Sequence, residues 1–321
     1  MSKKVYSGIG GQAVLEGVMM KNNEKYAVAV RKPNGEIEVK EQVFQGIKVL
    51  PKLKKIPFIR GTFNFIDSMI LGTSALNESA DYCEESAEDN KDNKFYNFIN
   101  KFTGGRAEQV ISVLVTLLSI ALAIGLFILL PSVISYYLKE KIDNEGMVSV
   151  LEGVVRILIF ILYVLLISFL KDIRRLFMYH GAEHKCINCI EAGMELTLEN
   201  VKKSSRQHKR CGTSFIFFVF LVSIVLFFFI RISNPLARTG LRILLIPVVA
   251  GISYELIRLA GRSENILVKA LSAPGMLVQL LTTKEPEDDM ILVAIASVEA
   301  VFDWRTFIKE NFNHMEQENE L

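Results

Sequence analysis

The residues best suited to chemistry are gathered in one stretch of the chain, from Tyr179 to Gly212. Imidazole and thiolate groups are the preferred ligands of Zn²⁺ and of other borderline transition metals. This clustering predicts a metal site, with zinc as the first choice, although another divalent transition metal would fit the same ligands. The alternative interpretation is a polar connector between two membrane helices. The stretch holds three of the four histidines and three of the four cysteines: His180, His184, His208, Cys186, Cys189 and Cys211.

The segment from His180 to His184 has the spacing H-x-x-E-H. On a helix, residues at offsets 0, 3 and 4 lie on one face, so two imidazoles and the Glu183 carboxylate would converge. In the inverted zincin arrangement the two histidines bind zinc and the glutamate acts as the general base. Gly181 is a poor helix former and weakens the pattern. The spacing predicts His180 and His184 as metal ligands and Glu183 as the catalytic residue.

Three further residues could complete the metal shell. His208 and Cys211 lie just before an apolar run, and Glu255 lies inside a later one. A carboxylate within a membrane is costly unless it is paired or coordinated, so Glu255 is a functional candidate. Its alternative role is an ion pair with Arg258, one turn further along. The sequence predicts that His208, Cys211 and Glu255 meet His180 and His184 at one interface.

Cys186 and Cys189 form a C-x-x-C pair that could supply two thiolates to a structural site. A closed shell of four ligands would leave no position for water, so this arrangement competes with the catalytic one. Glu191 and Glu195 are equally well explained as solvated helix residues. Glu16, in a glycine-flanked segment, is either an accessory residue that closes the site or a plain turn residue.

The rest of the chain indicates an integral membrane protein. Half of the 321 residues are hydrophobic, and several apolar runs reach the roughly 20 residues needed to cross a bilayer. The start of the chain has no apolar run behind its lysines, which predicts that there is no cleavable signal peptide. We expect a mostly α, polytopic protein with about four spans: Ala107–Leu130 ended by Pro131, Met147–Leu170, Ser214–Ile232 and Leu241–Gly261.

The distribution of Lys and Arg predicts the orientation in the membrane. Residues 1–106 carry 16 of them and residues 171–213 carry nine, whereas the other two connectors carry few. By the positive-inside rule, both termini and the 171–213 connector are cytoplasmic. The ligand cluster would then lie at the cytoplasmic membrane face, where cysteines stay reduced. The net charge of only +2 gives no sign of nucleic-acid binding.

The remaining segments divide the chain into four regions. Residues 1–62 are expected to be soluble and partly β, with a strand at Val14–Met20 and a hairpin of Tyr26–Arg31 and Glu36–Lys40 joined through Asn34-Gly35. Residues 63–106 hold an amphipathic helix, Phe63–Ala80, and a charged linker. Residues 107–282 form the membrane domain, in which Leu271–Thr282 is too short to cross and is broken by Pro274. Residues 283–321 hold a helix at Met290–Val301 and a charged tail.

Several long motifs resemble an uncharacterised bacterial membrane-protein family, a domain of unknown function often labelled as predicted metal-dependent enzymes. The motifs are GGQAVLEGVMMK at 10–21, HGAEHK at 180–185, HKRCGTSF at 208–215, PVVAGISYELIRLAGR at 247–262 and APGMLVQLLTTKEPEDD at 273–289. The resemblance implies a metal and a bacterial cytoplasmic membrane location, and it favours the same site residues. Lys21 stands where the family often has arginine. Cys186 and Cys189 lie outside the shared HGAEHK block.

Three functions fit these patterns. The first is a membrane-embedded zinc-dependent hydrolase, for example a peptidase, that acts on a protein or peptide at the cytoplasmic face of the lipid bilayer. The second is a membrane scaffold or assembly factor stapled by metal and without catalysis. The third is ion or solute transport through the charged residues Glu152, Arg156 and Glu255, which the lack of internal repeats disfavours. The oligomeric state stays open, a homo-oligomer included.

Overall fold

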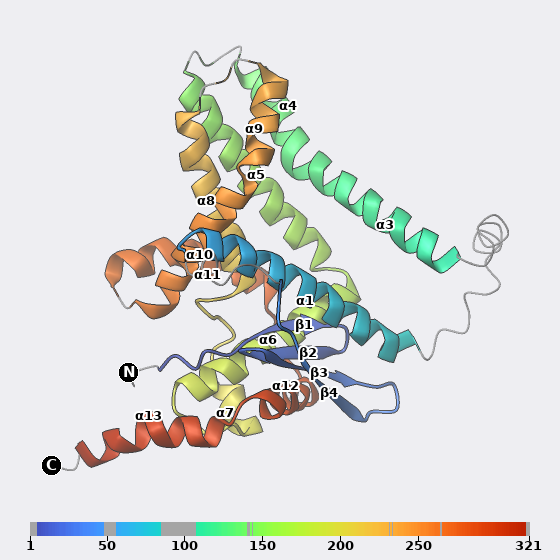
Figure 1. Cartoon of the computed structure of the whole chain (residues 1–321), viewed down its shortest axis with the longest axis vertical. Coiled ribbons are helices and arrows are strands. Elements are labelled where there is room, and N and C mark those ends of the chain that lie inside the picture. The colour runs from blue at the N-terminus through green and yellow to red at the C-terminus, as the bar shows by residue number, and fades with distance from the viewer. Residues whose placement is uncertain are drawn as a thin grey trace. The chain divides into compact units, whose positions relative to one another are not determined.

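The computed structural model describes residues 5–47, 56–84, 107–139, 142, 144–230, 232, 234–263 and 265–318. The charged linker expected before residue 95 lies almost wholly outside these residues. The chain divides into two compact units, one formed by Met1–Cys83, Val164–Val219 and Ile243–Leu321, and the other by Glu84–Tyr163 and Phe220–Arg242. Figure 1 labels the α-helices and strands of both units.

The first unit contains a four-stranded antiparallel sheet with the strand order β1-β2-β3-β4. The expected single strand at Val14–Met20 is wrong, because Leu15 and Glu16 form a two-residue turn between two strands. Glu16 has a φ of 48°, which a turn tolerates and a strand does not. The expected hairpin around Asn34-Gly35 is confirmed. The strands are β1 (Gly10–Val14), β2 (Gly17–Asn22), β3 (Lys25–Arg31) and β4 (Ile37–Val43).

Both faces of this sheet are covered by helices, as Figure 1 shows. Helix α1 (Ile59–Glu84) packs with Leu71 and Ala75 on the face that carries Met19 and Val28. On the opposite face, α6 (Lys171–Glu191), α7 (Leu198–Lys203) and α12 (Asp288–Val301) pack on alternate residues such as Val18 and Ala29. Successive side chains of a strand point to opposite faces of the sheet, so alternate residues contribute to the two separate hydrophobic cores. The helices expected at Phe63–Ala80 and Met290–Val301 are confirmed.

The C-terminal part of the first unit is more helical than the sequence indicated. Helix α10 (Ile246–Arg262) and α11 (Ile266–Thr282) form a pair bent by 113°. Pro274 lies inside α11 and does not break it, so the expected break is wrong. The charged tail is also helical over α13 (Trp304–Glu318). The fourth expected span is divided at Leu245 between α9 (Pro235–Leu244) and α10.

Three helical segments in the described residues are long and apolar enough to cross a membrane, and the bent pair α10–α11 would make a fourth. The length and composition of these helices are consistent with a membrane protein. The three segments are Val113–Tyr137, Gly146–Ile167 and Gly212–Phe229. They belong to the helices α3 (Ala107–Ile124), η3 (Gly125–Leu129), α4 (Leu130–Lys139), α5 (Glu145–Ile167) and α8 (Gly212–Phe229).

The first span does not end at Pro131, contrary to expectation. Pro131 has no N–H to donate to the carbonyl of Phe127, four residues earlier. The Nε atom of Arg156 donates to that carbonyl at 2.9 Å instead. The chain also widens into a π-helical turn over Gly125–Leu129, which is one of the known ways for a helix to absorb a local irregularity. The helix thus continues through the proline because a side chain of α5 replaces the missing partner.

The expected Glu152–Arg156 pair of α5 is confirmed, with 3.1 Å between Glu152 Oε1 and Arg156 Nη2. The same carboxylate is paired with Arg242 and accepts a hydrogen bond from the Ser132 hydroxyl. A buried carboxylate that is paired and hydrogen-bonded in this way is accommodated among the helices without a further ligand. The cluster therefore has a structural explanation and does not call for a transport function.

Candidate metal centre

Helix α6 carries the H-x-x-E-H segment, and its Gly181 allows a close contact with the chain after α11. A Cβ atom at Gly181 would collide with the main-chain carbonyl of Lys284. This close approach lets the Lys284 N–H donate to the carbonyl of Phe177 at 2.9 Å. Gly181 therefore lowers helix propensity but permits the chain after α11 to pack directly on α6. The helical spacing expected for His180, Glu183 and His184 is present in this helix.

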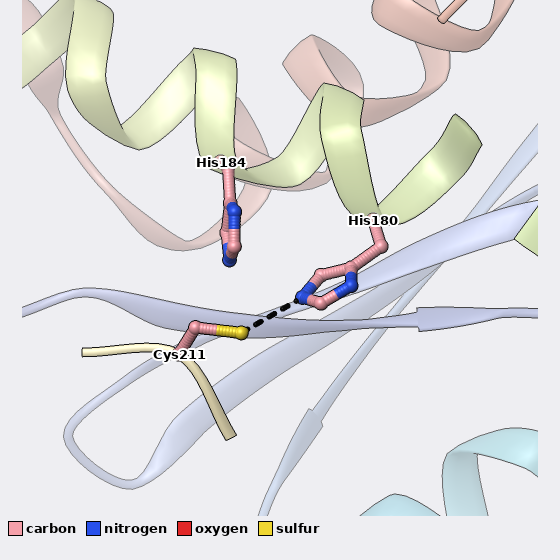
Figure 2. A group of neighbouring side chains, drawn as sticks. All are labelled: His180, His184 and Cys211. Atoms are coloured by element: carbon pink, nitrogen blue, oxygen red, sulfur yellow. Dashed lines mark hydrogen bonds between the residues drawn. The ribbon is translucent and has the colours of Figure 1, made fainter. Parts of the chain in front are cut away.

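Three potential ligands come together from two parts of the chain (Figure 2). His180 and His184 lie on α6, and Cys211 lies directly before α8. Their ligand atoms all lie within 4.8 Å of one another, and His180 Nε2 is 3.2 Å from Cys211 Sγ. Two nitrogens and one sulfur suit Zn²⁺, and a site with three protein ligands leaves a fourth position open.

The main chain orients both imidazoles. The Nδ1 atom of His180 lies 2.9 Å from the carbonyl oxygen of Thr282, and Nδ1 of His184 lies 2.7 Å from that of Arg206. A carbonyl can only accept, so each Nδ1 must carry the proton. The Nε2 atoms then have a lone pair available in the neutral rings and point into the cluster. Metal-binding histidines are held by the same type of outer hydrogen bond.

The charge state of Cys211 also suits a metal ligand. Burial alone would raise the pKa of this thiol, but the neighbouring His180 and His184 hold it well below its usual value. The backbone N–H of Thr213 lies 3.4 Å and its hydroxyl 3.1 Å from Sγ, so both can donate to a thiolate. In turn, burial opposes a charge on His180, but the Cys211 thiolate raises the pKa of His180 to about 9. A proton between Nε2 of His180 and Sγ of Cys211 therefore occupies the place that a metal cation would take.

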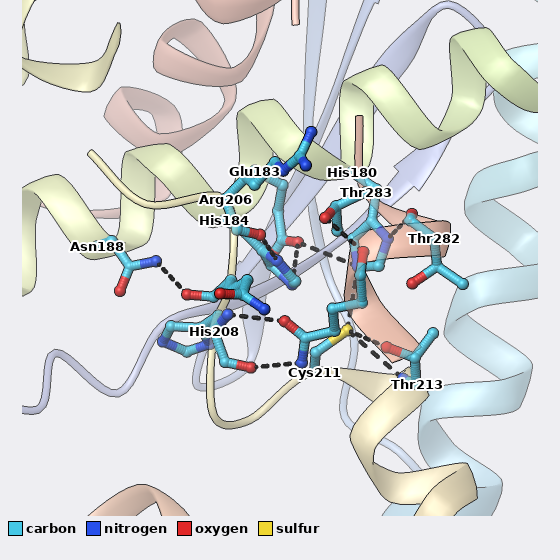
Figure 3. Close-up of polar contacts among 12 residues, drawn as sticks. His180, Glu183, His184, Asn188, Arg206, His208, Cys211, Thr213, Thr282 and Thr283 are labelled. Carbon is cyan, nitrogen blue, oxygen red and sulfur yellow. Dashed lines mark hydrogen bonds and ion pairs between the residues drawn. The ribbon is translucent and has the colours of Figure 1, made fainter. Parts of the chain in front are cut away.

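Glu183 lies beside the ligand atoms rather than among them (Figure 3). Its Oε2 atom is 3.6 Å from Nε2 of His184 and 4.0 Å from Nε2 of His180. The residue is only 4% exposed. A Cβ atom at Gly11 of β1 would collide with the Cγ of Glu183, so a glycine is needed where the strand passes the carboxylate. This placement suits a proton acceptor next to a bound metal.

The cluster opens into a cavity of about 580 Å³. This volume lies in the range of ligand-binding pockets, about 300–1,000 Å³. Besides His180, Glu183, His184 and Cys211, the walls include residues of β1, α1 and the segment before α8. They include Tyr6, Gly10, Gly11, Asn64, Ser68, His208 and Arg210.

His208 is close to the three ligands but does not join them. Its ring centroid is 5.7 Å from that of His184, while its Nε2 lies 3.5 Å from Oε2 of Glu191. Gln279 of α11 holds the His208 backbone, accepting from its N–H and donating to its carbonyl at 2.8 Å each. His208 thus lines the cavity as the partner of a carboxylate, in place of the ligand role expected for it.

Glu191, for which the sequence equally allowed a solvated position on the helix, is instead a buried residue of the site. It is 5% exposed and accepts hydrogen bonds from the N–H and hydroxyl of Ser7 and from Arg210. Burial opposes its charge, but His208 and Arg210 lower the pKa of Glu191 to about 2. The available signal was the helical period, because Glu191 follows His184 by two turns on the same face.

Asn188 is a second such residue, one turn after His184 on α6. Its Nδ2 atom donates to the carbonyls of Ser205 and Gln207 at 2.8 and 2.9 Å. These bonds bracket Arg206, whose carbonyl accepts from His184. Asn188 therefore fixes the loop that orients a ligand, a role that spacing alone does not reveal.

Glu255 also lies apart from the cluster. Both of its oxygens accept from Arg60, at 2.6 and 2.5 Å, and Arg258 is 3.9 Å away. A bidentate pair with arginine satisfies a carboxylate without a metal. The structure thus replaces the predicted ligand role with an ion pair, in which Arg60 rather than Arg258 is the main partner.

The remaining candidates, Cys186, Cys189 and Glu16, lie outside the ligand group of His180, His184 and Cys211. Cys186 is fully buried in the core between the sheet and α12, and the thiol of Cys189 lies 3.4 Å from the carbonyl of Glu195. Burial raises the pKa of both thiols, which disfavours thiolate ligands. Glu16 occupies the β1–β2 turn and pairs with Arg175 at 2.6 and 2.5 Å, so it tethers the sheet to α6.

Comparison with known proteins places the chain among proteins without an assigned activity. The family described as "Protein of unknown function (DUF1385)" matches residues 56–304. The uncharacterised protein YqhQ of Bacillus subtilis (strain 168) is 34% identical over 313 residues, covering 97% of this chain and 98% of its own. No solved structure matches the chain.

Proposed function

This chain belongs to the family of proteins of unknown function described as DUF1385, and from that premise we propose that it is a membrane-embedded zinc-dependent hydrolase. One observation carries the proposal. A ring nitrogen of His180, a ring nitrogen of His184 and Sγ of Cys211 lie within 4.8 Å of one another, and a cavity of about 580 Å³ reaches this group. Three ligands and an accessible cavity are typical of catalytic zinc sites, whereas structural sites are closed by four protein ligands.

In the proposed hydrolysis, some side chains of the cluster bind the metal and another transfers the proton. A zinc ion, when bound, supplies Lewis acidity that polarises a carbonyl and lowers the pKa of water. His180, His184 and Cys211 would hold the ion. The Oε2 atom of Glu183 faces the same point from the side, at 3.6 Å from His184 Nε2. It accepts a proton from the attacking water and returns it to the leaving group.

The orientation of the protein follows from its charges. The Lys and Arg residues are concentrated before residue 107 and between residues 171 and 213. The positive-inside rule therefore supports a site at the cytoplasmic face, with both termini on that side. Reduced cysteines agree with this compartment. A substrate would be a cytoplasmic or juxtamembrane protein or peptide.

The direct test is hydrolysis by the full chain, purified in detergent and loaded with zinc, against a library of quenched fluorescent peptides. We expect Glu183→Gln to lower turnover by about 100-fold or more, as loss of a general base does. Glu195→Gln is the control, because Glu195 is exposed just beyond the end of α6. Equal turnover in the wild type and Glu183→Gln would contradict the proposal.

The alternative, a metal-stapled scaffold without catalysis, has one supporting observation. The ligands join α6 to the start of α8, and the bond from His180 extends the link to the end of α11. The closure once expected from a C-x-x-C thiolate lacks support, since Cys186 lies in the core. A scaffold predicts that Glu183→Gln is silent while loss of any ligand unfolds the region.

A further inference from the structure

We propose that the cavity beside the metal centre binds its substrate as an extended polypeptide that pairs with the outer edge of β1. The inference rests on the proposed hydrolase function and adds the class of substrate and the way it is held. It depends on three features of the described residues: the edge position of β1, its passage beside Glu183, and the polar walls of the cavity.

The strand β1 lies at the edge of the sheet and pairs with β2 alone among the described strands. Val14 and Gly17 close a two-residue turn, and such a closing pair exchanges both backbone hydrogen bonds. The bonding alternates along an antiparallel pair, so Gln12 and Gly10 also bond to β2, whereas Gly11 and Ala13 direct their N–H and C=O groups outward. Ala13 is buried and Gly11 is exposed. The backbone of Gly11 therefore presents a donor and an acceptor to the cavity.

This backbone lies next to the catalytic cluster. A Cβ atom on Gly11 would collide with Cγ of Glu183, so the strand passes directly beside the proposed general base. A chain paired with Gly11 would thus pass near the ligand atoms of His180 and Cys211, which line the same cavity. Pairing of an extended peptide with a sheet edge supplies affinity through the main chain and leaves the side chains to give specificity.

The rest of the cavity can receive those side chains. Asn64 and Ser68 of α1 line one wall, and Tyr6 and Arg210 line another. Arg210 is held by its pair with Glu191 and by the ring of Tyr6, whose centroid is 4.1 Å from the guanidinium carbon. Polar groups that are already fixed orient a ligand at little entropic cost. The outward N–H and C=O groups of Gly11, together with the polar walls of the cavity, fit a peptide better than a lipid chain.

The test uses the zinc-loaded full chain in detergent and three hydroxamates. Acetohydroxamate reports the metal alone, N-acetyl-leucyl-alanyl-glycine hydroxamate adds a peptide, and the third compound is this peptide with its inner amides N-methylated. We expect calorimetry to show about tenfold tighter binding for the peptide than for acetohydroxamate, the effect of one or two hydrogen bonds. N-methylation should remove this gain. The peptide alone should slow amide hydrogen exchange in residues 9–13.

A variant gives an independent readout. A Cβ atom at Gly10 would meet no atom within 4 Å, and Gly10 lines the cavity. Gly10→Leu should therefore fold and keep its affinity for acetohydroxamate, yet lose the gain from the peptide. Gly240→Leu is the matched control, because Gly240 also has open space around its Cβ position and belongs to α9. It should behave as the wild type.

The outcomes separate this inference from the proposed function. Binding of acetohydroxamate with no gain from the peptide, or a gain that survives N-methylation or Gly10→Leu, would overturn the strand pairing and leave the hydrolase proposal standing. A protein that takes up no zinc and binds none of the three compounds would overturn both.

Discussion

The Nε2 atom of His180 lies 3.2 Å from the Sγ atom of Cys211, although 31 positions separate the two residues in the chain. The contact depends on the position of His180 on helix α6 and on the position of Cys211 directly before α8. His180 is fixed by the carbonyl of Thr282 and Cys211 by Thr213. Two independently placed elements thus deliver a nitrogen and a thiolate to one point, which is the arrangement that a metal ion requires.

The identity of the third ligand can be tested by replacing Cys211 with serine. A hydroxyl is a much poorer zinc ligand than a thiolate, so we expect Cys211→Ser to weaken zinc binding by about 100-fold or more. Competition with a fluorescent chelator measures the affinity. Cys189→Ala is the control, because Cys189 contacts backbone carbonyls outside the cluster, and it should leave the affinity unchanged. An equal loss in both variants would count against a direct role of Cys211.

Zinc affinity should depend on pH in a defined direction. Burial opposes the charge on His180, yet the thiolate raises the pKa of His180 to about 9, so below that pH zinc must displace a proton from the ring. The pKa of Cys211 is lowered, so the thiol costs no further proton. Burial likewise opposes a charge on His184, but the Cys211 thiolate raises the pKa of His184, so this ring can also lose a proton to zinc. We therefore expect zinc affinity to rise by about tenfold or more per pH unit between pH 6.5 and 8.5. A flat profile in the same chelator titration would contradict the binding of zinc to these two histidines.

The close approach at Gly181 predicts a sensitive position. Gly181→Ala would drive a methyl group into the carbonyl of Lys284, so we expect a loss of roughly 1–3 kcal/mol in stability despite the better helix propensity of alanine. Thermal unfolding in detergent measures the change. Gly212→Ala, at a position where a Cβ meets nothing within 4 Å, should show no such loss. A Gly181→Ala protein as stable as the wild type would mean that the chain after α11 is not packed as described.

The buried Glu191 should make stability depend on acid pH. Burial opposes its charge, but His208 and Arg210 lower the folded pKa to about 2 from an ordinary 4.5. The stabilisation is therefore complete above pH 4.5 and is lost as the pH falls from 4.5 towards 2. Glu191→Gln should cost roughly 2–4 kcal/mol at pH 7. The difference in melting temperature from the wild type should shrink at pH 3.5, whereas a constant difference would rule out this ionisation as the cause.

Local patterns predicted most of the elements, apart from the turn at Leu15 and Glu16 and the continuous helix through Pro274, whereas partners distant in sequence were not predicted. The helical spacing of His180, Glu183 and His184, the Asn34-Gly35 hairpin and the apolar spans depend on neighbours along the chain. Glu255 accepts a hydrogen bond from Arg60, and Glu191 accepts one from Ser7. These partners are about 190 residues away along the chain, so no local spacing pattern predicts them. Pro131 was misjudged for the same reason, since the side chain that replaces its missing donor is Arg156.

Zinc content of the purified full chain tests the central claim most directly. Elemental analysis would compare the wild type with His184→Ala and Glu183→Gln, all prepared without chelators. We predict about one zinc per chain in the wild type and in Glu183→Gln, and little in His184→Ala, because His184 supplies a ligand atom and Glu183 lies beside the ligand set. A wild type without stoichiometric metal, or a His184→Ala protein that keeps it, would contradict the account.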